Sequence, residues 1–272
     1  MASPLTWIQL TRRTKLYVQK LLSLKNKVIL VTGGAGKFGR SLVAGLAEAG
    51  GTIILASRSL EACQKVVDTL KAEGYSTSAM QLDQAVPESV RALKPAISDQ
   101  FGRLDVFVNN AYALTMLGYD DPLDDWAKSM AVNATGMFNL TREMIRLMER
   151  GGGGSVIHIG SMKGSFSPSF ELYEGTNMDA SPDYSFHKGG LVAFTKYLAR
   201  RFGPKNIRVN CISPGGLAAK QPEPFYSRYC KAVPLGRMAN DDDIKGLVVL
   251  LASDASAYLT GVDILMDGGL HC

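Results

Sequence analysis

Short apolar runs alternate with amphipathic stretches from Lys27 to the end of the chain. Seven of these runs have the length and the aliphatic composition of buried strands, at 27–32, 52–57, 76–82, 104–110, 154–160, 207–213 and 262–267. Helical spacing of apolar residues fills the intervals, up to about Ala49 and then near 60–73, 87–101, 127–150, 184–202 and 240–252. This alternation is typical of βαβ units, so it predicts an α/β fold in which helices cover both faces of one doubly wound parallel sheet.

The first 26 residues differ from this pattern. Leu10, Tyr17, Val18, Leu21 and Leu22 fall at helical spacing, and basic residues occupy other positions. We expect a short amphipathic helix in this extension, docked on its own domain or on a partner subunit, ahead of a catalytic domain over 27–272. A membrane-surface or targeting role is the alternative, because a basic start without acidic residues can resemble an organellar transit peptide.

Two stretches interrupt the alternation, and neither is typical of a linker between domains. Residues 151–154 are glycines before a strand, and residues 165–183 are rich in Ser, Pro, Glu, Tyr and Asp without periodicity. A chain of 272 residues that is 46% hydrophobic can bury one sizeable core. No run approaches the roughly 18 apolar residues of a membrane helix, so we expect no integral membrane association.

The net charge of +5 is concentrated at the start of the chain. The first 27 residues contain six basic residues and no acidic one, and the remainder has 24 basic and 25 acidic residues. The six are Arg12, Arg13, Lys15, Lys20, Lys25 and Lys27. A nearly neutral domain is not typical of nucleic-acid binding, so no nucleic-acid partner is expected.

Cysteine and histidine positions indicate neither a metal site nor a disulfide framework. Four cysteines and three histidines show no metal-ligand spacing. The prediction is a protein of the reducing cytoplasm that binds no metal.

A glycine-rich turn joins the first predicted strand to the first helix. Gly33, Gly36 and Gly39 follow Thr32, with Lys37 and Phe38 between them. Glycines allow a sharp turn and close approach to a pyrophosphate, whose charge the helix N-terminus stabilises. Because the turn occupies the first strand-to-helix connection of an alternating chain, it predicts dinucleotide binding by a Rossmann-type fold.

The end of the second strand indicates which dinucleotide binds. Folds that take NAD place an acidic residue there for the ribose hydroxyls, whereas this chain has Ser57 and Arg58. A guanidinium binds a 2′-phosphate with a planar fork, and Lys37 is expected to add a second charge. NADP(H) is therefore favoured over NAD(H).

Tyr184 and Lys188 open a predicted helix at i, i+4 spacing, which puts the phenol and the ammonium on one face. The ammonium and a cationic nicotinamide would stabilise a phenolate, so that the tyrosine exchanges protons near neutral pH. Ser161 follows a strand at the ligand-binding edge of the sheet, where its hydroxyl would hold a substrate oxygen. Three asparagines are expected near the same edge of the sheet: Asn109, Asn110 and Asn133. They either take part directly in the reaction or hold loops and backbone in place by hydrogen bonds.

These residues resemble the short-chain dehydrogenase/reductase family, classical type, over about Lys25 to Gly269. The matches are TGGAGKFG, Asp83, NNAY where the family has NNAG, Val132-Asn133, IGSMKG, Tyr184-x-x-x-Lys188, VNCISPGG, PLGRM and TGVDILMDGG. The YEGTNMDASPDYSFHKGG run is similar to a bacterial subgroup linked to surface-sugar synthesis.

The resemblance implies a role for each matched residue. Tyr184 would be the general acid and base, Ser161 would orient substrate, Lys188 would lower the pKa of Tyr184 and bind the nicotinamide ribose, and Asn133 would support a proton relay. Cofactor contacts are implied at Gly33, Gly36, Lys37, Phe38, Gly39, Ser57, Arg58, Asp83, Asn110, Ala111, Tyr184, Lys188, Pro214, Gly215 and Leu217. A homodimer or homotetramer is also implied.

Departures from the family pattern point to substrate choice. Ser161 and Tyr184 are 23 positions apart where the family has about 13, so Glu171, Tyr173 and Glu174 of the insert are expected beside the substrate. The loop 217–237 is expected to close over it, or to form an oligomer contact. Ala219 stands where many members have a threonine that contacts the carboxamide, and the glycine pattern is nearer that of extended members.

The expected function is an NADP(H)-dependent oxidoreductase that interconverts a carbonyl and a secondary alcohol on a small molecule, with a sugar or sugar-nucleotide as candidate substrate. One alternative is a dehydratase or epimerase that retains its nicotinamide. The other is a non-catalytic NADP(H)-binding regulator, which would not need Ser161, Tyr184 and Lys188 together.

Overall fold

The computed structural model describes residues 17–272, and it contains one α/β domain. Its sheet has seven parallel strands in the order β3-β2-β1-β4-β5-β6-β7. The strands are β1 (Val28–Thr32), β2 (Thr52–Ser57), β3 (Thr77–Gln81), β4 (Val106–Asn109), β5 (Gly154–Ile159), β6 (Ile207–Pro214) and β7 (Asp263–Met266). All seven predicted strands are confirmed.

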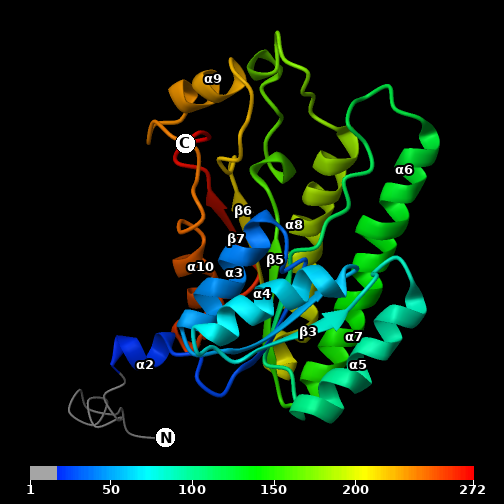
Figure 1. Ribbon diagram of the computed structural model, residues 1–272, viewed down its shortest axis with the longest axis vertical. Helices are drawn as coiled ribbons and strands as arrows, with labels where there is room; N and C mark the ends of the chain where they lie inside the picture. The colour runs from blue at the N-terminus through cyan, green and yellow to red at the C-terminus, as the bar shows by residue number, and fades with distance from the viewer. Residues whose placement is uncertain (1–16) are drawn as a thin grey trace, which may run out of the picture.

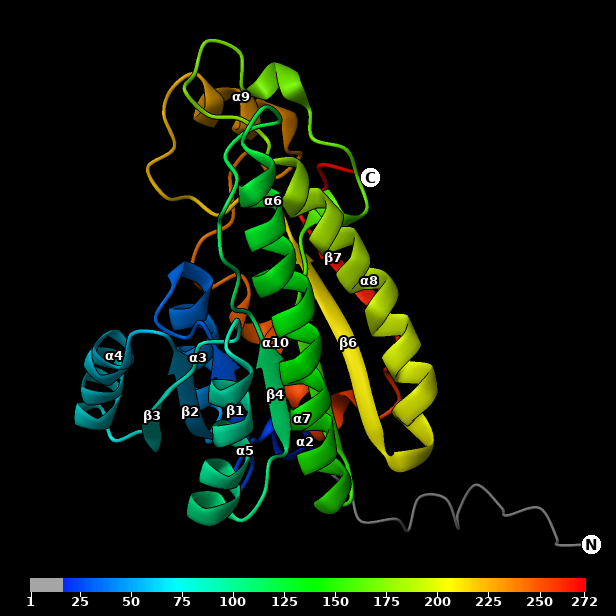
Figure 2. The same cartoon turned by 90° about the vertical axis from the view of Figure 1, so that its right-hand side faces the viewer.

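Helices cover both faces of the sheet, as predicted (Figures 1 and 2). One face carries α3 (Lys37–Glu48), α4 (Leu60–Ala72) and α10 (Lys245–Ala252); the other carries α5 (Pro87–Phe101), α7 (Met137–Arg150) and α8 (Pro182–Phe202). The last predicted helix begins later than expected, at Lys245 instead of about 240, because the preceding residues form turns around Asn240 and Asp243.

Side chains along each strand alternate between two cores. In β1, Ile29 and Val31 pack with α3 and α10, whereas Leu30 packs with α5 and α7. This period of two, with apolar residues on both faces, explains why the strands read as nearly continuous apolar runs. The sheet is therefore buried on both sides, and only its edges are available to a ligand.

The described part of the N-terminal extension is the short helix α2 (Val18–Leu22), which buries none of its residues and contacts the turn η5 (Asp254–Ser256) of its own domain. Leu24 is fully buried in the core, so packing begins before Lys27. Leu10 of the predicted amphipathic helix lies outside the described residues. No helix within 17–272 has the length and apolar composition of a membrane span.

Two elements were not expected. The segment predicted as one helix over 127–150 consists of α6 (Leu123–Ser129), a π-helix (Met130–Gly136) and α7. The predicted loop 217–237 contains α9 (Phe225–Ala232), whose Phe225 and Tyr229 pack with Val233 and Met238.

The strand order reverses direction between β1 and β4. In open α/β sheets, ligands bind outside the carboxyl ends of the strands at such a switch point.

Candidate active site

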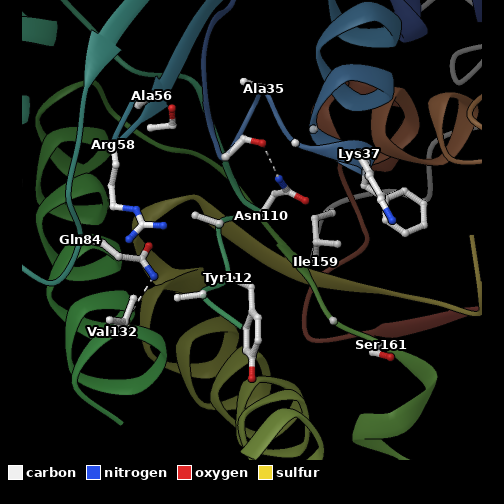
Figure 3. A pocket seen from close by; sticks show the side chains of 18 of the residues that line it. Ala35, Lys37, Ala56, Arg58, Gln84, Asn110, Tyr112, Val132, Ile159 and Ser161 are labelled. Atoms are coloured by element: carbon white, nitrogen blue, oxygen red, sulfur yellow. Dashed lines mark hydrogen bonds between the residues drawn. The ribbon is translucent and has the colours of Figure 1, made fainter. Parts of the chain in front are cut away.

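A groove of about 400 Å³ runs along the carboxyl edge of the sheet at this switch point (Figure 3). Nearly all the residues predicted for cofactor and chemistry line it: Gly33, Gly36, Lys37, Phe38, Gly39, Ser57, Arg58, Asp83, Asn110, Ala111, Ser161, Tyr184, Lys188, Pro214 and Gly215. Two predicted residues do not. Leu217 lines a neighbouring cavity, and Asn133 lies behind the groove wall, 5% exposed.

Sequence reasoning missed several residues of the groove wall. Most are neighbours in sequence of predicted ones, so a wider window at each strand end would have found them: Ala35, Ala56, Leu82, Gln84, Ala113, Val132, Ile159 and Gly160. Tyr112 carried a stronger signal, because it replaces the glycine of the family's NNAG run.

The glycine turn has the geometry that a dinucleotide pyrophosphate requires. Gly33 adopts φ +64°, where a side chain would be strained, and a Cβ on Gly39 would lie 2.1 Å from the Gly33 carbonyl oxygen. Gly36 is the N-cap of α3, and among the described residues no side chain caps this helix. Its first N–H groups therefore face the groove as an anion-binding site, which fits the phosphates of a nicotinamide dinucleotide.

Hydrogen bonds hold this turn against the end of β4. The Thr32 hydroxyl oxygen accepts from the backbone N–H groups of Asn110 (3.1 Å) and Ala111 (3.2 Å), and the Asn110 side chain donates to the carbonyls of Thr32 (3.0 Å) and Gly33 (3.2 Å). The Asn110 amide thus braces the two loops that form the floor of the groove.

Arg58 and Gln84 lie together at one side of the groove, whereas Lys37 lies at the other (Figure 3). The expectation that both cations flank one phosphate is therefore not met: Lys37 starts α3, and its side chain leaves the turn away from β2. The Gln84 amide nitrogen donates to the Val132 carbonyl (3.2 Å), but its oxygen is buried without a partner in the described chain.

The predicted catalytic side chains lie together in the groove, and they are Tyr184, Lys188 and Ser161. Tyr184 and Lys188 lie one turn apart near the start of α8, and the Lys188 ammonium is 5.4 Å from the centroid of the Tyr184 ring. Ser161 follows β5 and lines the groove together with Tyr184. Lys188 donates to the Ile159 carbonyl (2.7 Å), which fixes its direction. The structure brings the predicted catalytic set together.

Burial sets the proton affinities in this set. It raises the pKa of Tyr184, and the Ser161 hydroxyl only partly opposes this effect. It lowers the pKa of Lys188 to about 8, against a smaller opposing effect of Cys211. The expected lowering of the Tyr184 pKa is thus not seen in the described chain, where burial of the phenol is the largest effect on it.

Asn133 has a bracing role in the structure. It lies in the π-helix, its side-chain oxygen accepts from the N–H of Ala113 (2.9 Å), and its nitrogen donates to the Ala113 carbonyl (2.8 Å) and Ser129 (3.1 Å). These bonds hold the loop that carries Tyr112. The proton-relay role of Asn133 stays a prediction.

Tyr112 connects the catalytic set to a buried carboxylate. Its ring meets the Tyr184 ring edge-on at 5.0 Å, and the Lys188 ammonium lies 5.1 Å from its centroid. Its hydroxyl donates to Asp183 (3.0 Å), which is fully buried. Burial and the Asp183 charge raise the pKa of Tyr112, so this phenol stays neutral beside the two catalytic side chains.

A second cavity, of about 730 Å³, opens beyond Tyr184. Ser161, Tyr184, Phe38 and Gly215 line both this cavity and the groove. The remaining wall is mixed: apolar Leu114, Met116, Leu117, Met162, Met178 and Leu217, and polar Lys163, Asn177, Asp179 and Ser181.

The insert contributes to this cavity through residues other than those predicted. Asn177, Met178 and Asp179 line it, whereas Glu171 and Glu174 are exposed and only their carbonyls are used, by Arg228 of α9. The prediction of Glu171 and Glu174 beside the substrate is wrong because this part of the insert turns outward against α9. Among residues 17–272, no cluster of His, Cys, Asp and Glu has the arrangement of a metal site.

The sequence of the chain is similar to those of known proteins. A family model described as enoyl-(acyl carrier protein) reductase matches residues 34–271. The 3-oxoacyl-(acyl-carrier-protein) reductase FabG of Pseudomonas aeruginosa is 30% identical over 257 residues, which is 92% of this chain and 99% of that protein.

Solved structures agree in fold. A gluconate 5-dehydrogenase from Burkholderia cenocepacia, in complex with NADP and tartrate, has a TM-score of 0.84 and 27% identity over 93% of this chain and 98% of its own. A short chain dehydrogenase from Leptospira borgpetersenii with bound NAD+ has a TM-score of 0.82 and 29% identity over 92% and 94%. The chain therefore belongs to the short-chain dehydrogenase/reductase family, as an oxidoreductase that acts on carbonyl and alcohol groups with a nicotinamide cofactor.

Proposed function

We propose that the protein is an NADP(H)-dependent oxidoreductase that interconverts a carbonyl and a secondary alcohol on a sugar or a sugar-nucleotide. One observation carries the proposal: Ser161 and Tyr184 line both the dinucleotide groove and the second cavity. A proton-exchanging phenol thus lies where a cofactor in one space meets a substrate in the other.

The roles of the side chains follow from their positions. When bound, the nicotinamide would supply or accept the hydride. Tyr184 donates a proton to the carbonyl oxygen during reduction and accepts it back from the alcohol during oxidation. Ser161 donates a hydrogen bond to the same oxygen, and the positive charge of Lys188 stabilises the phenolate form of Tyr184.

The preference for NADP(H) rests on the end of β2. Arg58 lines the groove with Ser57, and no carboxylate stands at this strand end to repel a 2′-phosphate. Lys37 adds no support, since it lies on the other side of the groove. The relatives with solved structures bind NADP in one case and NAD+ in the other, so cofactor choice depends on this chain's own residues.

Binding of NADPH and NADH to the wild type, Arg58→Ala and the exposed control Arg91→Ala tests the cofactor. We expect NADPH to bind at least 10-fold more tightly than NADH, and Arg58→Ala alone to remove the preference, because a charge-assisted bond is worth about 1.5–3 kcal/mol. Tight NADH binding that is indifferent to Arg58 refutes the assignment.

Turnover of a panel of carbonyl sugars, with Tyr184→Phe as the control, tests the reaction. Stoichiometric oxidation of NADPH supports net reduction, whereas substrate conversion without a net change in NADPH absorbance indicates a retained cofactor. Turnover that survives Tyr184→Phe would mean that another group donates the proton.

The mixed polar and apolar wall of the second cavity supports a sugar as substrate, because a sugar presents hydroxyl edges and apolar faces to the same site.

Three exposed aromatic side chains on α7 and α8, Phe138, Phe186 and Tyr197, support the proposed homo-oligomer. Light scattering of the purified protein tests it. Four free cysteines support the cytoplasm as its location, and residues 1–26 stay proposed as an extension of the 27–272 domain.

A further inference from the structure

Lys163 is the only basic residue, within 17–272, that lines the cavity beyond Tyr184. Its ammonium lies 2.7 Å from the Tyr173 hydroxyl and 6.0 Å from the centroid of the Tyr184 ring. The positive charge therefore stands close to the phenol that exchanges the proton, on the substrate side.

Local structure explains this position. Lys163 is in the 3-10 turn η2 (Met162–Gly164), directly after Ser161, whose hydroxyl oxygen accepts the Lys163 N–H (3.2 Å). Tyr173 comes from the insert, and its ring lies 5.2 Å from the ammonium. The insert thus supplies the partner that holds the Lys163 side chain in the cavity.

Lys163 has no anionic partner in the described chain, where its ammonium bonds to the Tyr173 hydroxyl and forms no ion pair with a carboxylate. Burial lowers the pKa of Lys163, with Asp179 opposing this effect from a greater distance. Asp179 is exposed, and one of its oxygens already accepts the N–H of Ala180 (2.6 Å). A partly desolvated ammonium with a phenol as its only partner retains donors for an anion.

We infer that Lys163, held in place by Tyr173, binds an anionic group of the substrate, a carboxylate or a phosphate, close to its reacting carbon. The inference rests on the proposed carbonyl–alcohol chemistry and narrows its substrate class to sugar acids or sugar phosphates. Lys163 is thereby a specificity-determining residue, and the neutral Tyr173 hydroxyl fixes its direction.

Three six-carbon probes separate the possibilities: fructose, fructose 6-phosphate and 5-ketogluconate. Their dissociation constants are measured by calorimetry on the full-length protein with NADP+, for the wild type, Lys163→Met and Asp179→Asn. We expect at least one anionic probe to bind about 10-fold or more tightly than fructose, and Lys163→Met to remove this difference. The better anion distinguishes a sugar acid from a sugar phosphate.

Asp179→Asn is the matched variant for the opposite charge. Removal of a repelling carboxylate leaves anion binding unchanged or stronger, whereas a neutral polyol that used Asp179 as an acceptor would bind more weakly. The inference is overturned if fructose binds as tightly as both anionic probes, or if neither anionic probe binds. It is also overturned if the affinity difference between the anionic probe and fructose survives Lys163→Met. Tyr184→Phe keeps this binding pattern while it removes turnover, so the proposed reaction and the anion site fail independently.

Discussion

Asp183→Asn is expected to destabilise the fold strongly, because this one carboxylate accepts hydrogen bonds from several buried donors at once. The carboxylate is fully buried and accepts from Tyr112 (3.0 Å), Thr115 (3.4 Å), Ser129 (2.5 Å) and Ser181 (2.6 Å), and from the N–H of Tyr184. Burial by itself would raise the pKa of Asp183, but these hydrogen bonds outweigh it and lower the pKa. All these hydrogen-bond partners donate to Asp183. The NH₂ group of an asparagine at this position would be a further donor facing donors, and it could accept none of their hydrogen bonds.

The magnitude follows from the donors left without an acceptor. A hydrogen bond to a charged group is worth about 1.5–3 kcal/mol, so the loss of one or two such bonds costs about 1.5–6 kcal/mol. For a chain of this length, 1 kcal/mol corresponds to about 2 °C, so Tm should fall by about 3–12 °C.

Thermal unfolding followed by circular dichroism measures this change. Asp254→Asn is the control, since it removes a carboxylate of similar size from an exposed pair with Lys27, where about 0–1 kcal/mol is expected. A Tm for Asp183→Asn within about 1 °C of the wild type would refute the reasoning. It would mean that the donors find other acceptors or water.

Three further changes test other parts of the structure. Gly39→Ala places a Cβ 2.1 Å from the Gly33 carbonyl and should weaken NADPH binding about 10-fold or more in a titration, whereas Gly246→Ala has open space and should not. Because the Lys188 ammonium titrates with a pKa of about 8, kcat/KM should fall as pH rises above about 8; a flat profile to pH 10 would contradict its role. Burial lowers the pKa of His158 to about 3, so the unfolded state binds more protons below about pH 6.5, and the unfolding free energy should fall by up to about 1.4 kcal/mol per pH unit toward pH 4. His158→Gln should flatten that slope in urea titrations, and equal slopes would exclude His158 as its cause.

Local patterns predicted the strands and most helices because each buried strand and each amphipathic helix carries its own periodicity. The π-helix escaped prediction because its residues continue the apolar spacing of α6 and α7, and the wider turn changes no residue type. α9 escaped because it is short and follows a proline-rich stretch, and its stability depends on contacts of Phe225 and Tyr229 with distant segments.

The candidate site likewise contains residues that sequence patterns could predict and residues that they could not. Many groove residues could be predicted because they stand at strand ends, where the parallel sheet brings them together, and Tyr184 and Lys188 could be predicted from their spacing within one helix. The Asp183 network could not, since its donors come from positions up to 71 residues away and none forms a spacing motif with it. The separation of Lys37 from Arg58 was likewise invisible, because sequence indicates that both loops meet the groove but not where each side chain points.

Two of the departures from the family pattern, Tyr112 and the insert, provide side chains beside the catalytic set. Tyr112 replaces the family's glycine and places a neutral ring against Tyr184 and Lys188, anchored to Asp183 at the end of the insert. The insert also supplies Tyr173, which holds Lys163, and Asp179. The matched residues, together with Tyr112, form the cofactor groove. Because the hydride chemistry is common to the family, the activity particular to this chain should depend on the Lys163 side of the phenol. Substitutions of Lys163 or Asp179 should change substrate preference and leave NADPH affinity intact, because these two residues line the second cavity and not the groove.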